Sequence, residues 1–144
     1  MKRAVLVLAV AAMSVVFLFA VVNATQECPE TITMDSKVFT EHTKGLVTFS
    51  HKKHQTDYKV PCTECHHTYT DGKNTWKEGD AVQKCDACHA EAKAPAGTQM
   101  SKEEKIQKYY YSAIHENCLG CHKALKKEAK ATGPTSCKGC HPAK

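Results

Sequence analysis

The chain has 144 residues, nine cysteines, nine histidines and a formal net charge of +5. Beyond residue 24, leucine, isoleucine, valine and phenylalanine are scarce, while lysine, threonine, glutamate, histidine and alanine dominate. Burial of such side chains offsets little of the conformational entropy that folding removes. The composition therefore excludes an ordinary side-chain core, and it predicts either a disordered chain or a core supplied by another group.

The first 24 residues have the composition of an export signal. Lys2 and Arg3 precede an uncharged, mostly apolar run over 4–22, and Val22-Asn-Ala24 fits signal-peptidase cleavage after Ala24. Because the apolar run could also span a bilayer, an uncleaved anchor is the alternative. In either case we expect the rest of the chain outside the cytoplasm. We expect no nucleic-acid partner there, and membrane contact only through docking or such an anchor.

After this segment, the sequence predicts a flexible tail over 25–36. The segment Lys37–Ser50 has apolar residues separated by polar ones around Lys44-Gly45, which predicts a short two-stranded hairpin. A helical turn is expected at His51–His54. The stretch Gln55–Gly79 contains proline and glycine signals that favour loops.

Eight of the nine cysteines form four pairs with two residues between them, and a histidine follows each pair at once. The two thiols of a CxxCH motif add to the vinyl groups along one porphyrin edge, and the next imidazole then reaches the iron. The motifs are Cys62-Thr-Glu-Cys65-His66, Cys85-Asp-Ala-Cys88-His89, Cys118-Leu-Gly-Cys121-His122 and Cys137-Lys-Gly-Cys140-His141. We therefore expect four covalently bound c-type haems, which would also supply the missing core.

Two other uses of the paired cysteines are less favoured. Four disulfides in a secreted scaffold, or two tetrahedral zinc sites, would each employ eight cysteines. Neither explains why a histidine follows every second cysteine, and the zinc alternative predicts a colourless protein. The ninth thiol, Cys28, is expected to be an unmodified tail residue, with an intermolecular disulfide as the alternative.

Two helices are expected in the C-terminal half. The first covers about Lys102–Glu116, and Ser101 with Glu104 matches a capping box at its start. The second covers about Cys118–Ala131 and is ended by Gly133-Pro134. Four aromatic residues are interpreted as packing against haem: Trp76, Tyr109, Tyr110 and Tyr111.

Four haem irons require eight axial ligands, of which the motif histidines supply four. His51 and His54 are three residues apart, so they lie on one helical face and can reach two different haems. His67 directly follows His66 and therefore points toward a different haem. His115, at the end of the first expected helix, completes the set of eight.

His42 lies in a polar run and is expected to be exposed rather than a ligand. Methionine could replace an imidazole, but Met34 and Met100 lie away from every motif. With imidazole at every axial position, no iron has an open site for a substrate. We therefore expect outer-sphere electron transfer and no enzyme activity.

The order of these ligands resembles that of the tetrahaem cytochromes c3. The resemblance covers about 47–144 and rests on Phe49-Ser-His51-Lys-Lys-His54, Cys65-His66-His67 and Tyr109-Tyr-Tyr-Ser-Ala-Ile-His115. It implies a small haem-cored multihaem cytochrome c fold over 37–144, mostly loops with a few short α-helices and a short N-terminal β-hairpin. It also implies four ligand pairs on haems 1 to 4, respectively His51 with His66, His67 with His89, His54 with His122, and His115 with His141.

Two features resemble different branches of that family. Two-residue spacing in all four motifs resembles the type II, or acidic, branch, which associates with membrane redox complexes. Residues 102–144 contain nine lysines and four glutamates. Five of these lysines resemble the patch by which the type I branch docks hydrogenase: Lys123, Lys126, Lys127, Lys130 and Lys138. The implied function is periplasmic electron transfer between hydrogenase and a membrane-bound redox complex in anaerobic, sulfate-reducing respiration. The alternative is a terminal reductase of metal ions or another extracellular acceptor.

Overall fold

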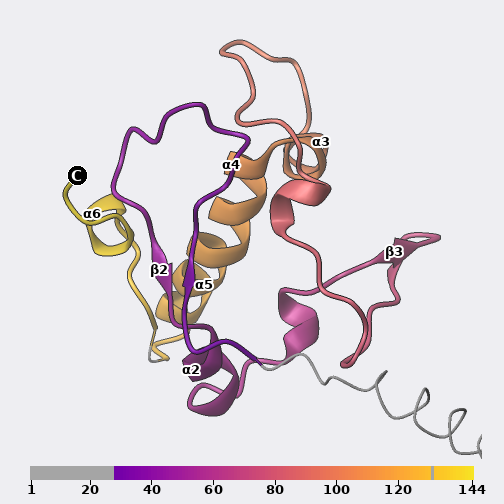
Figure 1. Ribbon diagram of the computed structural model, residues 1–144, viewed down its shortest axis with the longest axis vertical. Coiled ribbons are helices and arrows are strands. Elements are labelled where there is room, and N and C mark those ends of the chain that lie inside the picture. Colours follow the sequence, from indigo (N-terminus) through magenta and orange to yellow (C-terminus); the bar gives the residue numbers. More distant parts are fainter. Residues whose placement is uncertain (1–27, 131) are drawn as a thin grey trace, which may run out of the picture.

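The computed structural model describes residues 28–130 and 132–144. Over these residues the chain is mostly loops, joined to short helices and to two sheets of two strands each (Figure 1). This architecture confirms the expected fold class. The predicted export segment lies outside the described residues. Within the described part, no helix is long and apolar enough to cross a membrane.

The N-terminal sheet begins earlier than the sequence predicts. β1 (Ile32–Thr33) pairs antiparallel with β2 (Thr48–Phe49), and Ile32 lies opposite Phe49. The first strand therefore falls in the segment expected to be a tail, and Lys37 lies in the loop between the strands. Ser36 is buried in this loop because its hydroxyl donates a hydrogen bond to Asp86 Oδ2 at 2.8 Å, a contact with a distant segment.

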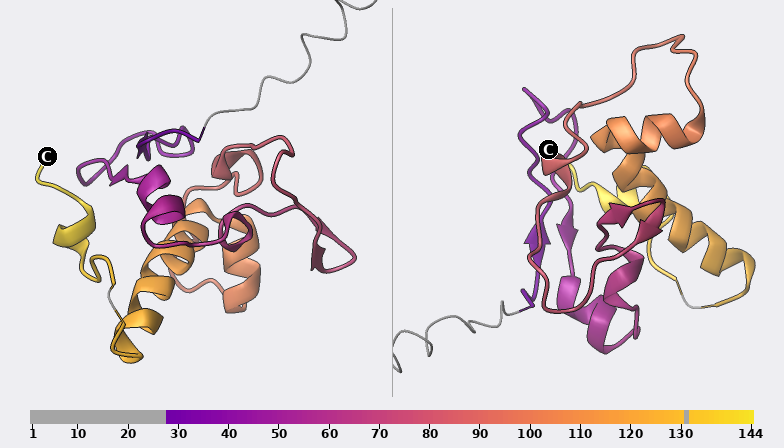
Figure 2. Two further views of the ribbon diagram at one scale, coloured as in Figure 1. Left: turned by 90° about the horizontal axis from the view of Figure 1, so that it is seen from below. Right: turned by 90° about the vertical axis from the view of Figure 1, so that its right-hand side faces the viewer.

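The next elements follow the second strand directly. α2 (His51–Thr56) is the expected helical turn, and the 3-10 helix η1 (Cys62–Glu64) comes after it. A second hairpin, β3 (Tyr69–Thr70) with β4 (Lys73–Asn74), then projects from the body (Figures 1 and 2). The sequence predicts only a loop there. The two-residue connection Asp71-Gly72 has φ values of +50° and +74°, the conformation that tight hairpins require.

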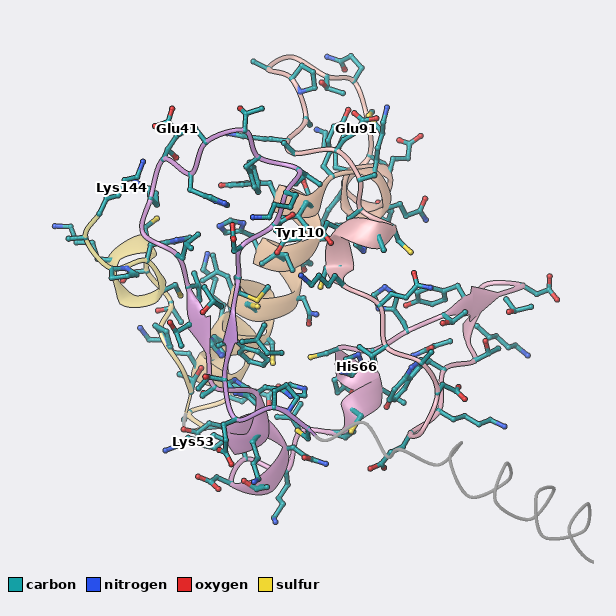
Figure 3. All side chains as sticks on the ribbon, in the orientation of Figure 1. Glu41, Lys53, His66, Glu91, Tyr110 and Lys144 are labelled. Atoms are coloured by element: carbon teal, nitrogen blue, oxygen red, sulfur yellow. The ribbon has the colours of Figure 1, made fainter. Side chains whose placement is uncertain are left out.

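The first expected helix is divided in two. α3 (Lys102–Lys108) starts with the predicted capping box, in which the Ser101 hydroxyl accepts from the Glu104 backbone N–H. Tyr109 is extended, with φ −106° and ψ 124°, and α4 (Tyr110–Ile114) starts after it. The break arises because Tyr110 N donates to Glu91 O at 2.8 Å, which ties this point of the helix to another segment (Figure 3). A continuous helix from Lys102 to Glu116 is therefore wrong.

The chain from α4 onward stays helical as far as Lys127. A π-helix, η3 (His115–Gly120), leads without a break into α5 (Cys121–Lys127). The second expected helix therefore has no separate start at Cys118. Two further short helices are η2 (Cys85–Ala87), a 3-10 turn, and α6 (Cys137–Cys140).

Few side chains in the described part are buried, and none is fully buried. The buried residues are Ser36, Trp76, Tyr109, Tyr110 and Ala113. Three of the four aromatic residues predicted to pack against haem are in this group, while Tyr111 is 41% exposed. The thin side-chain core agrees with the composition, and it leaves most of the buried apolar surface to be supplied by another group.

Candidate haem sites

Each CxxCH motif lies on helical backbone, in three cases a short turn and in the third motif a longer helix. η1, η2 and α6 carry the first, second and fourth motifs, and the third spans the end of η3 and the start of α5. In three motifs the histidine backbone N–H donates to the carbonyl of the first cysteine: His66 to Cys62 at 2.8 Å, His89 to Cys85 at 3.0 Å and His141 to Cys137 at 2.8 Å. All nine cysteines belong to the described part, and each is a free thiol. The eight motif thiols are therefore available for attachment to haem.

Eight of the nine histidine rings meet in four pairs. The distances between ring centroids are 6.0 Å for His51 and His66, 6.1 Å for His67 and His89, 6.3 Å for His54 and His122, and 6.3 Å for His115 and His141. These are the four pairs that the resemblance implies. Each pair joins one motif histidine to one histidine from outside the motifs.

The ring separation is the one that a single metal ion requires. A metal bound by both Nε2 atoms at about 2.0 Å, with each nitrogen about 1.1 Å from its ring centre, separates the two centroids by about 6.2 Å. Rings in direct stacking contact would lie much closer together. The four separations therefore fit one six-coordinate iron between the members of each pair.

Five of these rings are anchored by backbone carbonyls. His54 Nδ1 lies 2.8 Å from Ser50 O, His89 Nδ1 3.0 Å from Gln107 O, His115 Nδ1 2.8 Å from Tyr111 O, His122 Nδ1 2.9 Å from Pro134 O and His141 Nδ1 2.9 Å from Gly45 O. A carbonyl oxygen only accepts, so Nδ1 carries the proton in each ring. The lone pair is then on Nε2, which is the arrangement that metal-binding histidines use.

Two glycines make room for these anchors. A Cβ on Gly45 would meet the Pro142 carbonyl oxygen, beside the contact between Gly45 O and His141. A Cβ on Gly133 would meet the His122 ring and lie 2.7 Å from its Nε2. Both positions therefore need a residue without a side chain, because the backbone passes directly against a histidine ring or its neighbour.

The first pair has different surroundings. His51 Nδ1 lies 3.2 Å from the Cys28 thiol sulfur, so the ninth cysteine contacts a histidine. The His66 ring stacks on Trp76, with centroids 4.9 Å apart and an interplanar angle of 27°. His67, from the second pair, lies 5.3 Å from the Tyr69 ring. Neither His66 nor His67 has a hydrogen bond from a ring nitrogen to any described residue.

Burial shifts the pKa of four motif side chains toward the neutral form. Burial lowers the pKa of His66 below its ordinary value, and nearby His51 and His67 lower it further. A neutral ring retains the lone pair that iron needs. Burial also raises the pKa of the Cys118 thiol to about 11, and burial acts in the same direction on Cys65 and Cys85. A thioether to haem carries no ionisable proton, so this burial does not oppose attachment.

His42 is not part of any pair. Its Nε2 lies 3.1 Å from Asp35 Oδ1, and the side chain is 29% exposed. It is therefore half-buried against a carboxylate rather than freely exposed as expected. Its ring also lies 5.7 Å from that of Phe39. These contacts account for His42 without a metal.

The chain has clear relatives among cytochromes. Residues 25–141 match the Class III cytochrome C family. A cytochrome c3 from Maridesulfovibrio salexigens is 39% identical over 124 residues, which cover 82% of this chain and 98% of that protein. A cytochrome c3 from Desulfovibrio desulfuricans is 36% identical over 107 residues, covering 69% of this chain and 81% of that protein. The crystal structure of the di-tetraheme cytochrome c3 from Desulfovibrio gigas is 28% identical, covers 80% of this chain and 97% of that one, and has a TM-score of 0.49.

Proteins of this kind bind c-type haems and transfer electrons between redox partners. The donor set fits that cofactor, because the thiols of the CxxCH motifs lie beside pairs of imidazoles at the spacing of one iron. The cofactor is therefore haem rather than zinc. The match over 25–141 and the 39% identity over most of the chain lead to one conclusion: the chain belongs to the Class III cytochrome C family.

Proposed function

We propose that each CxxCH motif and one ring pair hold one haem. In this assignment haem 1 has Cys62, Cys65, His66 and His51; haem 2 has Cys85, Cys88, His89 and His67; haem 3 has Cys118, Cys121, His122 and His54; haem 4 has Cys137, Cys140, His141 and His115. The observation that carries the proposal is the ring separation of 6.0 to 6.3 Å in all four pairs.

Bound c-type haem supplies reversible one-electron chemistry at iron. The protein residues decide what can reach that iron. Two imidazoles per site leave no coordination position for a substrate, and the carbonyl anchors at Nδ1 hold the rings in place. The arrangement therefore supports outer-sphere electron transfer by a carrier, and it disfavours reduction of a ligand bound to the metal.

Short covalent connections link the four sites in one order. His66 and His67 are neighbours and join haem 1 to haem 2. His51 and His54 share α2 and join haem 1 to haem 3. His115 and His122 lie on the continuous helix through η3 and α5, which joins haem 4 to haem 3. These connections support an electron route in the order 2, 1, 3, 4.

The C-terminal lysines support a partner with an acidic surface. Lys123, Lys126 and Lys127 are exposed on α5, Lys138 is exposed on α6, and none has an ion pair within the described part. A cavity of about 480 Å³ between α3 and η3 includes lysines and the proposed haem 4 ligand His115 in its lining. Other lysines are paired, as Lys144 is with Glu41 at 3.4 Å (Figure 3). Three of these lysines follow the haem 3 motif and Lys138 lies within the haem 4 motif, so docking here would bring hydrogenase or a membrane-bound redox complex close to this end of the route.

The proposed place of action is the periplasm. The charged start and the long apolar run of residues 1–24 are the features of exported proteins. The proposed role is thus periplasmic electron transfer between hydrogenase and a membrane redox complex.

The first test is the mass and visible spectrum of the full chain expressed with a haem-maturation system. We expect the mass of a chain from Thr25 with four haems, and low-spin six-coordinate bands in both oxidation states. Fewer haems, or a high-spin component, would contradict bis-histidine ligation at one site. That result would favour the alternative of a terminal reductase.

The second test concerns the partner. Reversing one charge in Lys126→Glu should slow electron transfer from hydrogenase and weaken its dependence on salt. Lys73→Glu on β4 is the matched control, because that hairpin projects on another side of the molecule (Figure 1). Equal rates for both variants would contradict docking at the C-terminal lysines while leaving the haem assignment intact.

A further inference from the structure

Ser36 is the most deeply buried residue in the described part of the chain, with 3% of its surface exposed. Its hydroxyl donates to Asp86 Oδ2 at 2.8 Å, and its oxygen accepts from the Val38 backbone N–H at 3.4 Å. A carboxylate only accepts, so the single hydroxyl proton of Ser36 is committed to Asp86. The bond joins segments 50 residues apart, and it satisfies a buried hydroxyl that would otherwise lack an acceptor.

Tyr110 of α4 lies beside this pair. Its ring is buried and meets that of Phe39, from the same loop as Ser36, edge-on with centroids 5.8 Å apart. Burial raises the pKa of Tyr110 to about 12, and the nearby charge of Asp86 acts in the same direction. The phenol is therefore neutral at ordinary pH and does not offset the charge of Asp86, which is itself half-buried.

Asp86 stands between the two cysteines of the second motif. Both thiols are assigned to haem 2, so the residue between them stays beside the edge of that porphyrin. Two other motifs have a charged residue between their cysteines, Glu64 in the first and Lys138 in the fourth, and both of these are exposed. Among the three, only Asp86 is half-buried and bonded to a buried group. Water and salt screen its charge less than they screen the other two.

We infer that Asp86 lowers the reduction potential of haem 2, and that Ser36 is the positioning residue that holds its carboxylate away from water. The inference rests on the assignment of Cys85, Cys88 and His89 to haem 2 under the proposed function. Oxidation adds one positive charge at the iron, and a fixed negative charge nearby stabilises that state. Reduced haem 2 is thereby a stronger electron donor to a partner than the same haem without Asp86.

The test uses the holoprotein with all four haems and follows each haem separately by NMR during redox titration. Asp86→Asn removes the charge, while the amide oxygen can still accept from Ser36. The potential of haem 2 should rise, with a roughly tenfold change in its ratio of oxidised to reduced form at a fixed potential, as expected for a unit charge about 10 Å from the iron at an effective dielectric constant of about 20. An unaltered potential of haem 2 would overturn the inference.

Glu64→Gln is the matched control. It removes the same charge from between the cysteines of the first motif, where the side chain is exposed. The shift that it causes at haem 1 should be smaller than the shift that Asp86→Asn causes at haem 2. Equal shifts would show that the buried contact adds nothing, and they would overturn the role of Ser36.

Ser36→Ala tests the positioning separately. Without the hydroxyl, the carboxylate can turn into water, so Asp86→Asn should shift haem 2 less in this background than in the wild-type protein. The same shift in both backgrounds would contradict the positioning role of Ser36 and leave its hydrogen bond purely structural. Failure of the proposed function has a different signature, namely a missing or high-spin haem 2 in the wild-type protein.

Discussion

The four histidine pairs form two groups that differ in ring orientation. The rings are steeply inclined in the first two pairs, at 85° for His51 with His66 and 77° for His67 with His89. They are nearly parallel in the other two, at 23° for His54 with His122 and 27° for His115 with His141.

The anchoring of the rings divides in the same way. All four rings of the parallel group have Nδ1 beside a backbone carbonyl. In the inclined group only His89 does, while His51 contacts a thiol and His66 an indole. A carbonyl fixes the rotation of a ring about its own side-chain bond. All rings of the parallel pairs thus have backbone anchors, whereas the inclined pairs rely mostly on other contacts.

The largest expected difference between the groups is spectroscopic. Parallel imidazoles raise the energy of the same iron d orbital, which separates it from its partner, whereas perpendicular imidazoles raise both orbitals equally. The oxidised holoprotein should therefore give two classes of low-spin signal in electron paramagnetic resonance. Haems 3 and 4 should be rhombic, and haems 1 and 2 strongly axial. A single class for all four haems would break the comparison.

Replacing one ligand in each group should have the next largest effect. His67→Met should raise the potential of haem 2 by on the order of 0.1 V, since axial ligands move haem potentials over a range of roughly 0.8 V. His54→Met should do the same for haem 3. His54 also loses its carbonyl anchor, so we expect this variant to be the less stable of the two. The measurements are redox titration and thermal unfolding, and an unchanged spectrum for His67→Met would contradict its role as a ligand.

Gly133→Ala tests the anchoring of the parallel group. The new Cβ would meet the His122 ring, so the ring should rotate and the rhombic signal of haem 3 should change. Overpacking of this kind costs about 1 to 3 kcal/mol of stability, measurable by denaturant unfolding. Gly120→Ala is the control, because its Cβ would meet only the flexible end of Glu116, at 3.2 Å. Equal effects of both substitutions would count against the anchor.

The smallest effect is expected at Cys28. With Nε2 of His51 on iron, Nδ1–H donates to the Cys28 sulfur at 3.2 Å, a bond weaker than the roughly 0.5 to 1.5 kcal/mol of an ordinary neutral hydrogen bond. Cys28→Ala removes the acceptor and should raise the haem 1 potential slightly. Cys28→Ser retains an oxygen acceptor and should stay closer to wild type. A downward shift in the alanine variant would contradict this interaction.

Much of the site could be predicted from the sequence, because covalent attachment imposes a fixed spacing. The CxxCH motifs and the extra histidines at 51, 54, 67 and 115 carry that constraint in the chain itself. The capping box at Ser101 is also local, and the structure confirms it. The ring pairs, in contrast, were implied by resemblance, since nothing local determines which two histidines face each other.

The features that the sequence analysis missed depend on distant segments or on weak local signals. The helix breaks at Tyr109 because the backbone of Glu91 bonds to the residues on either side, and no helical pattern records that contact. β1 starts at Ile32 because Phe49 lies opposite. The hairpin after the first motif had a usable signal in Asp71-Gly72, which was assigned only to a loop. The contact between Cys28 and His51 spans 23 residues, and neither segment alone predicts it.

The π-helix η3 has a consequence for how two haems are oriented. In a regular α-helix, residues seven apart complete almost two turns, so His115 and His122 would lie on the same face. The wider turn of η3 rotates one histidine relative to the other about the helix axis. The two rings of one helix can therefore bind two different irons. The spacing of these irons is then set by a length of rigid helix. The rate of electron exchange between the two irons should therefore respond little to motion of the surrounding loops.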